Sequence, residues 1–197
     1  MKEFWDNRYA NEEYAYGLKP NEFFKQELLK RKPKSILFPA EGEGRNAVFA
    51  AKNGWKVKAF DFSLSAREKA LKLAKQQGVD IDYEIAGFDE FTASPNSFDC
   101  IILIHAHTPA HKRNLYHKKI VEFLKPGGNL ILEGFSKEQF TRNSGGPKNI
   151  DMLFSEDELL NDFKELKQIK IETVEIELDE GAFHQGTASV IRLTATK

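Results

Sequence analysis

Short apolar runs alternate with longer amphipathic helical patterns between residues 35 and 135. The strand-like runs span 35–40, 56–60, 81–86, 98–105 and 129–135, and the helical patterns span about 45–53, 63–77 and 110–124. Strands that are apolar on both faces and separated by helices are typical of a parallel sheet covered on both sides. The alternation therefore predicts an α/β, Rossmann-like doubly wound sheet with five parallel strands.

The pattern changes towards the carboxyl terminus. A capping box at Ser155 and Glu158 predicts a short helix. Two long strand-like runs follow, 168–178 and 187–196, with only a short linker between them. Because no helix separates these two strands, we expect them to pair as an antiparallel hairpin that completes a seven-stranded sheet.

Length and charge limit the class of protein. A chain of 197 residues suits a single domain, 1–197, with residues 1–32 as an N-terminal helical segment. The 29 Lys and Arg nearly cancel the 30 Asp and Glu, so no basic field recruits nucleic acid or an anionic membrane. The single cysteine, Cys100, suits a reducing compartment. We expect a cytoplasmic monomer or homodimer that acts on a small molecule, with no nucleic-acid or membrane partner.

The stretch from Lys34 to Ser63 reads as strand, glycine turn, helix and strand, and Asp61 stands at the end of the second strand. Its "GEGRNA", 42–47, fits G-x-G-x-x-A. Glycines let the backbone approach a ligand, a helix N-terminus offers free N–H groups, and an acid accepts hydrogen bonds from ribose hydroxyls. This pattern predicts a nucleotide-type cofactor site. Pro39 is compatible with it at the carboxyl end of the first strand, where the ladder stops.

Downstream segments narrow the cofactor. "FDCIILIHAH" (98–107), a helix, and "EFLKPGGNLILEGF" (122–135) resemble class I S-adenosylmethionine-dependent methyltransferases, in which a Pro-Gly-Gly turn introduces the fifth strand. "GEGRNA", "KPGG", a carboxyl-terminal Glu-Gly-x-x-His segment and the opening "FWDNRYANEEYAYGLKPNEF" resemble the branch related to tellurite-resistance and thiopurine methyltransferases. The resemblance covers most of the chain and implies a single methyltransferase domain with S-adenosyl-L-methionine as its cofactor.

The chain departs from that family in the glycine turn. The family usually carries an acid two residues before the first of three alternating glycines. Here Phe38 holds the acid position and Ala40 the first glycine position, while Gly42 and Gly44 remain. We predict that Glu41, beside the missing acid, takes over the contact with the ammonium group of the cofactor, directly or through water.

The resemblance implies a set of cofactor-binding residues at the carboxyl ends of the strands. These are Tyr16, Glu41, Gly42, Gly44, Arg45, Asp61, Phe62, Gly87, Phe88, Ile104 and His105. Related enzymes often carry an acid after the third strand to hold the adenine amino group, but Gly87 stands there. Asp89 either substitutes for that acid or simply caps a turn, and Phe88 is expected to flank the adenine with its backbone N–H.

Methyl transfer from a sulfonium is an in-line displacement, so the protein must align the acceptor and exclude water. A base is needed only if the acceptor is poorly ionised. We predict catalytic roles for His107, His184 and Arg192. His107 lines the acceptor pocket or is a hydrogen-bonded histidine at a strand end. The resemblance implies that His184 takes a proton and Arg192 holds an anionic substrate; the alternatives are a turn residue and an edge-strand charge.

Other histidines invite a metal interpretation. His105 and His107 share one face of a strand, and His111 lies nearby. Because no companion acid or cysteine cluster stands at ligand spacing, we predict no metal site. His117 is expected to face outward on a helix. Residues 136–154 are long and irregular and are predicted to form a lid over the acceptor, with a simple surface excursion as the alternative.

The resemblance alone implies the acceptor class, which is a small molecule with a sulfur, selenium or tellurium nucleophile. Two alternatives stay open. The altered glycine turn is compatible with a non-catalytic S-adenosylmethionine-binding sensor. An NAD(P)-dependent oxidoreductase would use a similar turn, although the sequence has no Tyr-x-x-x-Lys or comparable hydride-transfer motif in a suitable context.

Overall fold

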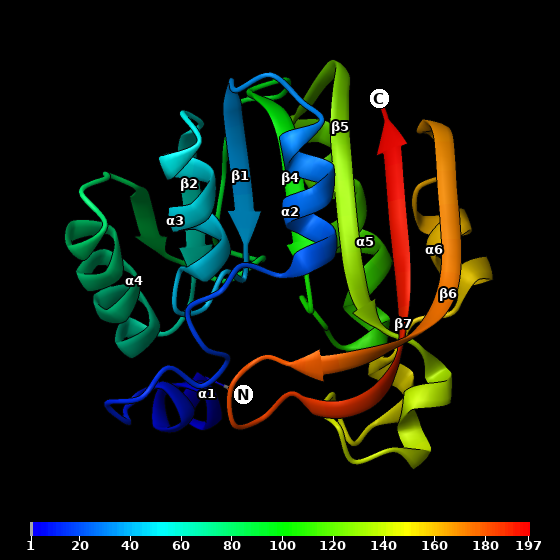
Figure 1. The fold of residues 1–197 in the computed structure, drawn as a ribbon. Helices are drawn as coiled ribbons and strands as arrows, with labels where there is room; N and C mark the ends of the chain where they lie inside the picture. Colours follow the sequence, from blue (N-terminus) through cyan, green and yellow to red (C-terminus); the bar gives the residue numbers. More distant parts are fainter. Residues whose placement is uncertain (1) are drawn as a thin grey trace.

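The computed structural model describes residues 2–197, which form one mixed sheet with helices on both faces (Figure 1). The seven strands lie in the order β3-β2-β1-β4-β5-β7-β6. Strands β1 to β5 pair in parallel, and β7 is antiparallel to both β5 and β6. The predicted α/β sheet of five parallel strands with a carboxyl-terminal antiparallel hairpin is confirmed.

The element boundaries follow the predicted ones closely. The strands are β1 Ser35–Pro39, β2 Lys56–Asp61, β3 Asp82–Ile85, β4 Phe98–Ile104, β5 Leu124–Phe135, β6 Lys167–Asp179 and β7 Gln185–Thr196. The α-helices are α1 Lys2–Tyr9, α2 Glu22–Leu29, α3 Arg45–Lys52, α4 Leu64–Gln76, α5 Ala110–Phe123 and α6 Glu156–Asp162, and the 3-10 helices are η1 Lys137–Thr141 and η2 Ile150–Met152. Within residues 2–197, no helix has the length and apolar character needed to cross a membrane. Strand β5 begins earlier than predicted because Leu124 pairs with Phe98 across an irregularity in the ladder.

The two faces of the sheet bury different side chains, because successive residues of a strand point in opposite directions. Helices α2, α3 and α4 cover one face, and α5 and α6 cover the other (Figure 1). Phe38 of β1 is fully buried under α2, where its ring meets Phe24 edge to face at 5.6 Å. The position at which the resembled family carries an acid is therefore an apolar core position in this chain.

The carboxyl ends of β1, β2, β4 and β5 reach the same edge of the sheet, where an open α/β sheet forms its crevice. Pro39 is the last residue of β1, as predicted. Strands β6 and β7 continue past this edge, and their connecting turn reaches the N-terminal segment (Figure 1). A Cβ at Gly181 of this turn would lie only 2.5 Å from the carbonyl oxygen of Ala15. The two terminal regions of the chain thus meet beside the glycine turn.

His117 of α5 is buried, which corrects the prediction that it faces outward. Its side chain is 2% exposed, and its ring stacks on Phe163 at 4.7 Å. The Nδ1 atom lies 2.8 Å from Oδ2 of Asp162, and Nε of Arg113 donates to the same oxygen at 2.8 Å. The periodicity of α5 could not predict this contact, because the second buried face of the helix exists only once α6 packs against it.

Asp162→Asn tests this buried cluster. Burial raises the pKa of Asp162, but hydrogen bonds from His117, Asn114 and Arg113 outweigh burial and lower the pKa to about 2. Because this pKa lies below the ordinary value of 3.8, the stabilisation is present above pH 4 and is lost as the pH falls towards 2. At pH 7 we expect Asp162→Asn to lower the free energy of unfolding in urea by roughly 2 kcal/mol.

The exposed Asp80 provides the control, since Asp80→Asn should change the free energy of unfolding by less than about 0.5 kcal/mol. The deficit of Asp162→Asn should shrink when unfolding is measured at pH 3. A deficit that is the same at pH 7 and pH 3 would contradict the assignment of this stabilisation to the ionised carboxylate.

Candidate active site at the carboxyl edge of the sheet

The glycine turn between β1 and α3 depends on its glycines. Gly42 and Gly44 have φ angles of 65° and 86°, a region that glycine enters without steric cost. A Cβ at Gly44 would lie 2.6 Å from the Cβ of Ala70, so glycine also lets α3 approach α4. Ala40, at the first glycine position of the family pattern, has φ 51° and adopts the left-handed region despite its side chain.

Asp61 closes the turn from the end of β2. Its Oδ2 accepts a hydrogen bond from the Gly42 N–H at 3.2 Å, and its Oδ1 accepts one from the Ser63 N–H at 2.9 Å. Burial raises the pKa of Asp61 to about 6, against the lowering effect of these backbone hydrogen bonds. The structure therefore joins the acid and the glycine turn into one unit, while the contact of Asp61 with a ribose stays a prediction.

Glu41 is directed at the start of helix α3. Its Oε1 accepts hydrogen bonds from the N–H groups of Asn46 and Ala47 at 3.0 and 2.7 Å. Burial raises the pKa of Glu41 to about 8, so the carboxyl group is mostly protonated at neutral pH. Both features reduce its attraction for an ammonium group, and its predicted role as the replacement acid stays untested.

Helix α1 lies over the glycine turn. A Cβ at Gly42 would meet the hydroxyl oxygen of Tyr9 at 2.8 Å, and Trp5 stacks on Tyr9 with ring centroids 5.4 Å apart. Further along the segment, Nη1 of Arg8 donates to the Tyr16 hydroxyl at 3.0 Å. The N-terminal segment thus covers the turn with aromatic side chains.

The predicted adenine side of the site lies after β3. The Gly87 N–H donates to Oε2 of Glu90 at 2.9 Å, and a Cβ at Gly87 would lie 3.9 Å from the ring of Phe62. Phe88 stacks on the ring of Tyr116 at 4.9 Å. Asp89 accepts hydrogen bonds from Lys112 and Tyr116 at 2.6 and 2.8 Å. Within the described part of the chain, Asp89 therefore fastens the loop to α5 and makes no turn cap, while Glu90 bonds the turn N–H of Gly87. The predicted role of Asp89 as the substitute acid stays a prediction.

His105 follows Ile104 at the end of β4 and has an unusual environment. Its φ angle of 52° lies in the left-handed region. Its ring stacks on Phe135 at 4.6 Å and meets the ring of His184 edge to face at 4.8 Å. Both ring nitrogens are buried and have no hydrogen-bond partner. Burial lowers the pKa of His105 well below its ordinary value, so its ring is neutral at pH 7.

Glu180, in the turn between β6 and β7, connects three parts of the chain. Its Oε2 accepts a hydrogen bond from Nη2 of Arg45 at 2.8 Å, and its Oε1 accepts one from Nδ2 of Asn21 at 3.2 Å. Nδ1 of His184 lies 3.3 Å from Oε2. Burial alone would raise the pKa of Glu180, but the hydrogen bond from His184 and the charge of Arg45 hold it well below its usual range. Glu180 is therefore a largely buried, ionised carboxylate, with 13% of its side chain exposed.

A second buried acid lies beside the first. Glu133 of β5 is fully buried and pairs with Arg192 of β7, whose Nε donates to Oε2 at 2.7 Å. Nδ2 of Asn21 donates to Oε1 of Glu133 at 2.6 Å, so one amide bridges Glu133 and Glu180. The guanidinium carbon of Arg192 lies 5.0 Å from the ring centroid of Phe23. Arg192 is thus already paired with an acid, which limits the charge it can offer to an anionic substrate.

His107 has both ring nitrogens occupied by the backbone. Nε2 accepts a hydrogen bond from the Phe135 N–H at 3.0 Å, so the proton is on Nδ1, which donates to the Met152 carbonyl oxygen at 2.8 Å. Burial lowers the pKa of His107 to about 4, and the ring is neutral. This geometry matches the alternative of a hydrogen-bonded histidine at a strand end. A catalytic role would require these bonds to open.

The predicted lid, residues 136–154, is fastened to the sheet. Oε1 of Gln139 accepts a hydrogen bond from the Ser189 N–H at 2.9 Å, and the Ser144 hydroxyl donates to the Thr187 carbonyl oxygen at 2.7 Å. These bonds attach the segment to β7, close to the turn that carries His184. The position next to the candidate site agrees with a covering role, which stays a prediction.

Most of the predicted site residues fall into two neighbouring groups, while Phe62, Gly87 and Phe88 lie on the predicted adenine side and His107 is hydrogen-bonded to backbone groups. Glu41, Gly42, Gly44 and Asp61 form the glycine-turn group under α1, whereas Tyr16, Arg45, His105, His184 and Arg192 lie in or beside the polar network around Glu180. Sequence reasoning missed Glu180, Glu133 and Asn21. Glu133 is an isolated acid in an apolar strand, and Glu180 lies four residues before His184 in the same turn. Both positions could therefore have been chosen from the sequence as candidate site residues.

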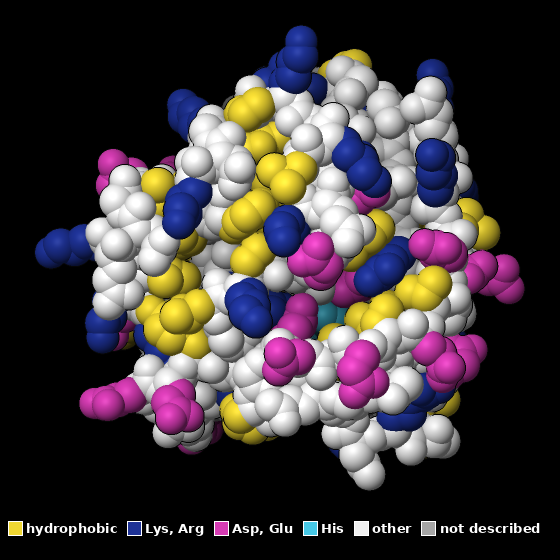
Figure 2. Space-filling model, in the orientation of Figure 1, with side chains coloured by type: hydrophobic (Ala, Val, Ile, Leu, Met, Phe, Trp, Pro, Cys, Tyr) yellow, Lys and Arg dark blue, Asp and Glu magenta, His cyan; other side chains and the backbone are white. Residues whose placement is uncertain are grey.

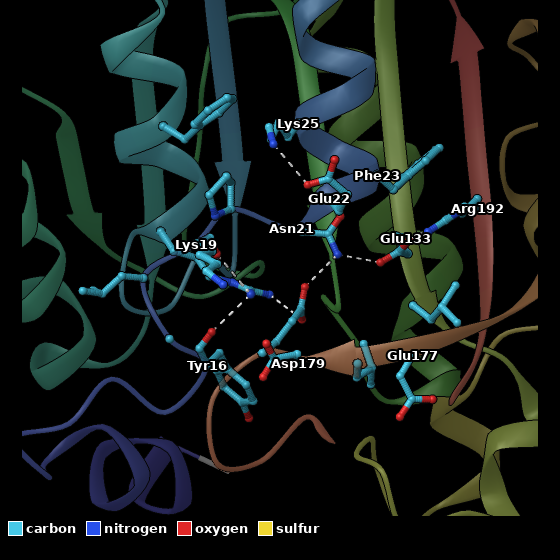
Figure 3. A pocket seen from close by; sticks show the side chains of 18 residues that line it. Tyr16, Lys19, Asn21, Glu22, Phe23, Lys25, Glu133, Glu177, Asp179 and Arg192 are labelled. Carbon is cyan, nitrogen blue, oxygen red and sulfur yellow. Dashed lines mark hydrogen bonds and ion pairs between the residues drawn. The ribbon is translucent and has the colours of Figure 1, made fainter. Parts of the chain in front are cut away.

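A cavity of about 660 Å³ opens onto this network between the N-terminal segment and β6 (Figure 3). Its lining includes Tyr16, Arg45, Glu133, Glu180 and Arg192. Figure 2 shows the mouth as a hollow in which acidic and basic side chains surround a visible histidine. The cavity has the size of a small-molecule site and lies beside the glycine turn rather than over it.

Comparison with known proteins gives a consistent result for the central part of the chain. Residues 36–128 match a family model described as "Methyltransferase domain". A 2-heptyl-1-hydroxyquinolin-4(1H)-one methyltransferase from Mycobacteroides abscessus is 30% identical over 110 residues, which cover 54% of this chain and 48% of that protein. A demethylmenaquinone methyltransferase from Renibacterium salmoninarum is 33% identical over 108 residues, 53% of this chain and 43% of that protein. The chain thus spans about half the length of these curated relatives.

Solved structures match over the whole chain at low sequence identity. One of them is titled "Conversion of a Disulfide Bond into a Thioacetal Group during Echinomycin Biosynthesis". Its TM-score is 0.80 at 16% identity, and the match covers 100% of this chain and 91% of that chain. TehB from Haemophilus influenzae has a TM-score of 0.74 and 15% identity and covers 100% of this chain and 66% of that chain. The chain therefore has the seven-stranded methyltransferase fold, and its residues 36–128 match a methyltransferase domain.

Proposed function

We propose that the protein transfers a methyl group from S-adenosylmethionine to a small-molecule acceptor held in the 660 Å³ cavity. The observation that carries this proposal is the position of Arg45. This residue begins helix α3 directly after the glycine turn, and its guanidinium pairs with Glu180 in the cavity wall at 2.8 Å. A single side chain thus extends from the predicted cofactor turn to the cavity wall, which supports a cofactor and an acceptor bound next to each other.

The residues of the glycine turn fit the chemistry of the cofactor. Gly42 and Gly44 form a turn without side chains, and Asp61 has carboxylate oxygens at the end of β2 that could accept hydrogen bonds from ribose hydroxyls. When bound, the cofactor supplies a methyl group on a positively charged sulfur. Because Tyr9 contacts Gly42, we infer that α1 shifts to admit the cofactor and then helps to exclude water from it.

His184 is the candidate base. Its Nδ1 lies 3.3 Å from Oε2 of the ionised Glu180. An ionised carboxylate can only accept a hydrogen bond, so the neutral ring carries its proton on Nδ1 and has none on Nε2. Burial lowers the pKa of His184, which keeps the ring neutral at pH 7 and able to accept a proton through Nε2. Glu180 orients the ring and stabilises the imidazolium that forms when a proton arrives.

The acceptor class that we propose is a small nucleophile based on sulfur, selenium or tellurium, in keeping with the resemblance to the tellurite-resistance and thiopurine branch. TehB and the structure tied to disulfide-to-thioacetal conversion share the whole fold with this chain, but their identities of 15% and 16% carry the fold alone. The curated relatives are named for a hydroxyquinolone and for demethylmenaquinone, so a bicyclic aromatic hydroxyl or ring carbon is the second candidate acceptor.

Asp61→Ala tests the cofactor site. We expect it to weaken binding of S-adenosylmethionine and S-adenosylhomocysteine by roughly 1.5–3 kcal/mol, the scale of losing charge-assisted hydrogen bonds, as measured by calorimetry. Asp82→Ala is the control, since Asp82 is exposed on the neighbouring strand and should leave affinity unchanged. Because Asp61 also holds two backbone N–H groups, thermal unfolding of both variants must confirm that they remain folded. Unchanged affinity in folded Asp61→Ala would mean that the ribose site lies elsewhere.

His184→Ala tests the chemistry with a panel of thiols, selenols, tellurite and hydroxyquinolones, with methylated product and S-adenosylhomocysteine as readouts. We expect kcat to fall roughly 100-fold for acceptors that must lose a proton, because general-base catalysis contributes on this scale. The fall should be smaller for acceptors already ionised at the assay pH, and cofactor affinity should stay near that of the wild type. The exposed His111 supplies the control His111→Ala.

Equal turnover of His184→Ala and wild type on every acceptor would show that His184 is only a turn residue. Cofactor binding by the wild type without product from any acceptor would instead favour the non-catalytic sensor. Tight binding of NADH without binding of S-adenosylhomocysteine would contradict the methyltransferase proposal as a whole.

A further inference from the structure

His105 is a buried histidine whose ring nitrogens have no partner among the described residues. Its side chain is 10% exposed, and both Nδ1 and Nε2 are shielded from solvent. Buried polar side chains in proteins are almost always hydrogen-bonded, because an unpaired one loses its interactions with water without compensation. His105 is also held at φ 52°, so the backbone adopts a rarely used conformation to direct this ring. Such a residue calls for a ligand as its explanation.

Two side chains that can bind a metal ion, those of Glu180 and His184, lie close to the His105 ring. One ligand atom each from His105, Glu180 and His184 lie within 4.8 Å of one another. Nε2 of His105 is 3.7 Å from Oε2 of Glu180, and Nδ1 of His184 is 3.3 Å from the same oxygen. Ligands of a tetrahedral ion with bonds of 2.0–2.1 Å are separated by about 3.4 Å. Two of the three separations therefore come close to those of a coordinated ion.

We propose that His105, His184 and Glu180 bind a divalent transition-metal ion of the Zn²⁺ type. Two imidazoles and one carboxylate suit Zn²⁺, Co²⁺ or Ni²⁺, whereas Mg²⁺ and Ca²⁺ prefer oxygen ligands. The site lies beside the cavity, since Glu180 also belongs to the cavity lining. Three protein ligands would leave one tetrahedral position for an exchangeable water or substrate, as in catalytic zinc sites.

The surroundings orient these ligands. Asn21 donates to Oε1 of Glu180, which leaves Oε2 on the side of the two histidines. Phe135 packs against both rings, with centroids 4.6 Å from His105 and 5.1 Å from His184. Supporting contacts of this kind around metal ligands hold them in position for the ion.

Charge sets the strength of the site. Arg45 donates to the same Oε2 of Glu180 at 2.8 Å, so the ion competes with a guanidinium for this oxygen. Glu133, with Oε1 3.9 Å from Nε2 of His105, contributes a second negative charge that Arg192 partly balances. The site is therefore weaker than a closed structural zinc site, and it suits an ion that is exchanged rather than permanently held.

This metal site does not depend on the proposed function. A bound ion would occupy Nδ1 of His184, the nitrogen that otherwise donates to Glu180. The neutral ring would then carry its proton on Nε2, so His184 could not act as a base in the metal-bound form. The competing explanation is that the acceptor or cofactor itself meets the His105 nitrogens. Metal binding measured without cofactor or acceptor distinguishes the two explanations, and its failure leaves the methyl-transfer proposal untouched.

The experiment uses the full chain without a histidine tag and without cofactor, titrated with Co²⁺ and then with Zn²⁺. We expect one equivalent of Co²⁺ to give the intense visible absorption of a tetrahedral site, Zn²⁺ to abolish this absorption, and Zn²⁺ to raise Tm. His105→Asn should weaken binding roughly tenfold or more. Asparagine tolerates the left-handed backbone at this position, and the His105 ring has no hydrogen-bond partner to leave unpaired, so this variant should fold.

His111→Asn is the matched control, because His111 is exposed and lies on α5 away from the cluster. It should bind Co²⁺ and Zn²⁺ as the wild type does. His184→Asn should lose the tetrahedral absorption as His105→Asn does, which provides a second variant if one is unstable. Absence of visible absorption and of a Tm shift in the wild type would overturn the proposal, and so would equal binding by His105→Asn and wild type.

Discussion

The largely buried carboxylate of Glu180 is the interaction on which the candidate site depends. It accepts hydrogen bonds from Arg45 at the start of α3 and from Asn21 at the start of α2, and it lies next to His184 in its own turn. A buried charge is tolerated only when it is paired and hydrogen-bonded, so these partners and the carboxylate require one another. The contacts join the N-terminal segment, the glycine turn and the β6–β7 turn, which come from distant parts of the sequence.

This arrangement explains why the site is polar while the sheet beneath it is apolar. The sheet is held by side chains such as Phe38, which fills the position of the acid in the resembled family and packs on Phe24. Glu133 is an exception, since it carries a charge in an otherwise apolar segment of β5. Hydrogen bonds from Arg192 and Asn21 offset part of the cost of its burial. A strand that enters the site from the core can thus carry one acid near its carboxyl end.

Particular residues show how far sequence reasoning reached. The alternation of apolar runs and helical patterns predicted all five parallel strands, because burial on both faces leaves a direct mark on composition. Pro39 lies at the end of β1, as its missing N–H required. The prediction that His117 faces outward was wrong, because α6 covers that face of α5. Helix α6 follows His117 by about forty residues in the chain, so the local pattern of α5 does not reveal the contact. His105 and His107 were grouped as neighbours on one face of a predicted strand, but β4 ends at Ile104. The His107 nitrogens are bonded to backbone groups, whereas the His105 nitrogens have no hydrogen-bond partner among the residues that the structure describes.

The sequence by itself determined the sheet, its parallel and antiparallel parts, and the glycine turn with Asp61, because these follow from local periodicity and from the backbone freedom of Gly42 and Gly44. Only the tertiary structure decided which polar side chains share a site. His105 and His184 meet across almost eighty residues of chain, and the meeting follows from the turn of the β6–β7 hairpin passing the end of β4. Such contacts depend on how distant elements pack, and packing leaves no periodic mark in the chain.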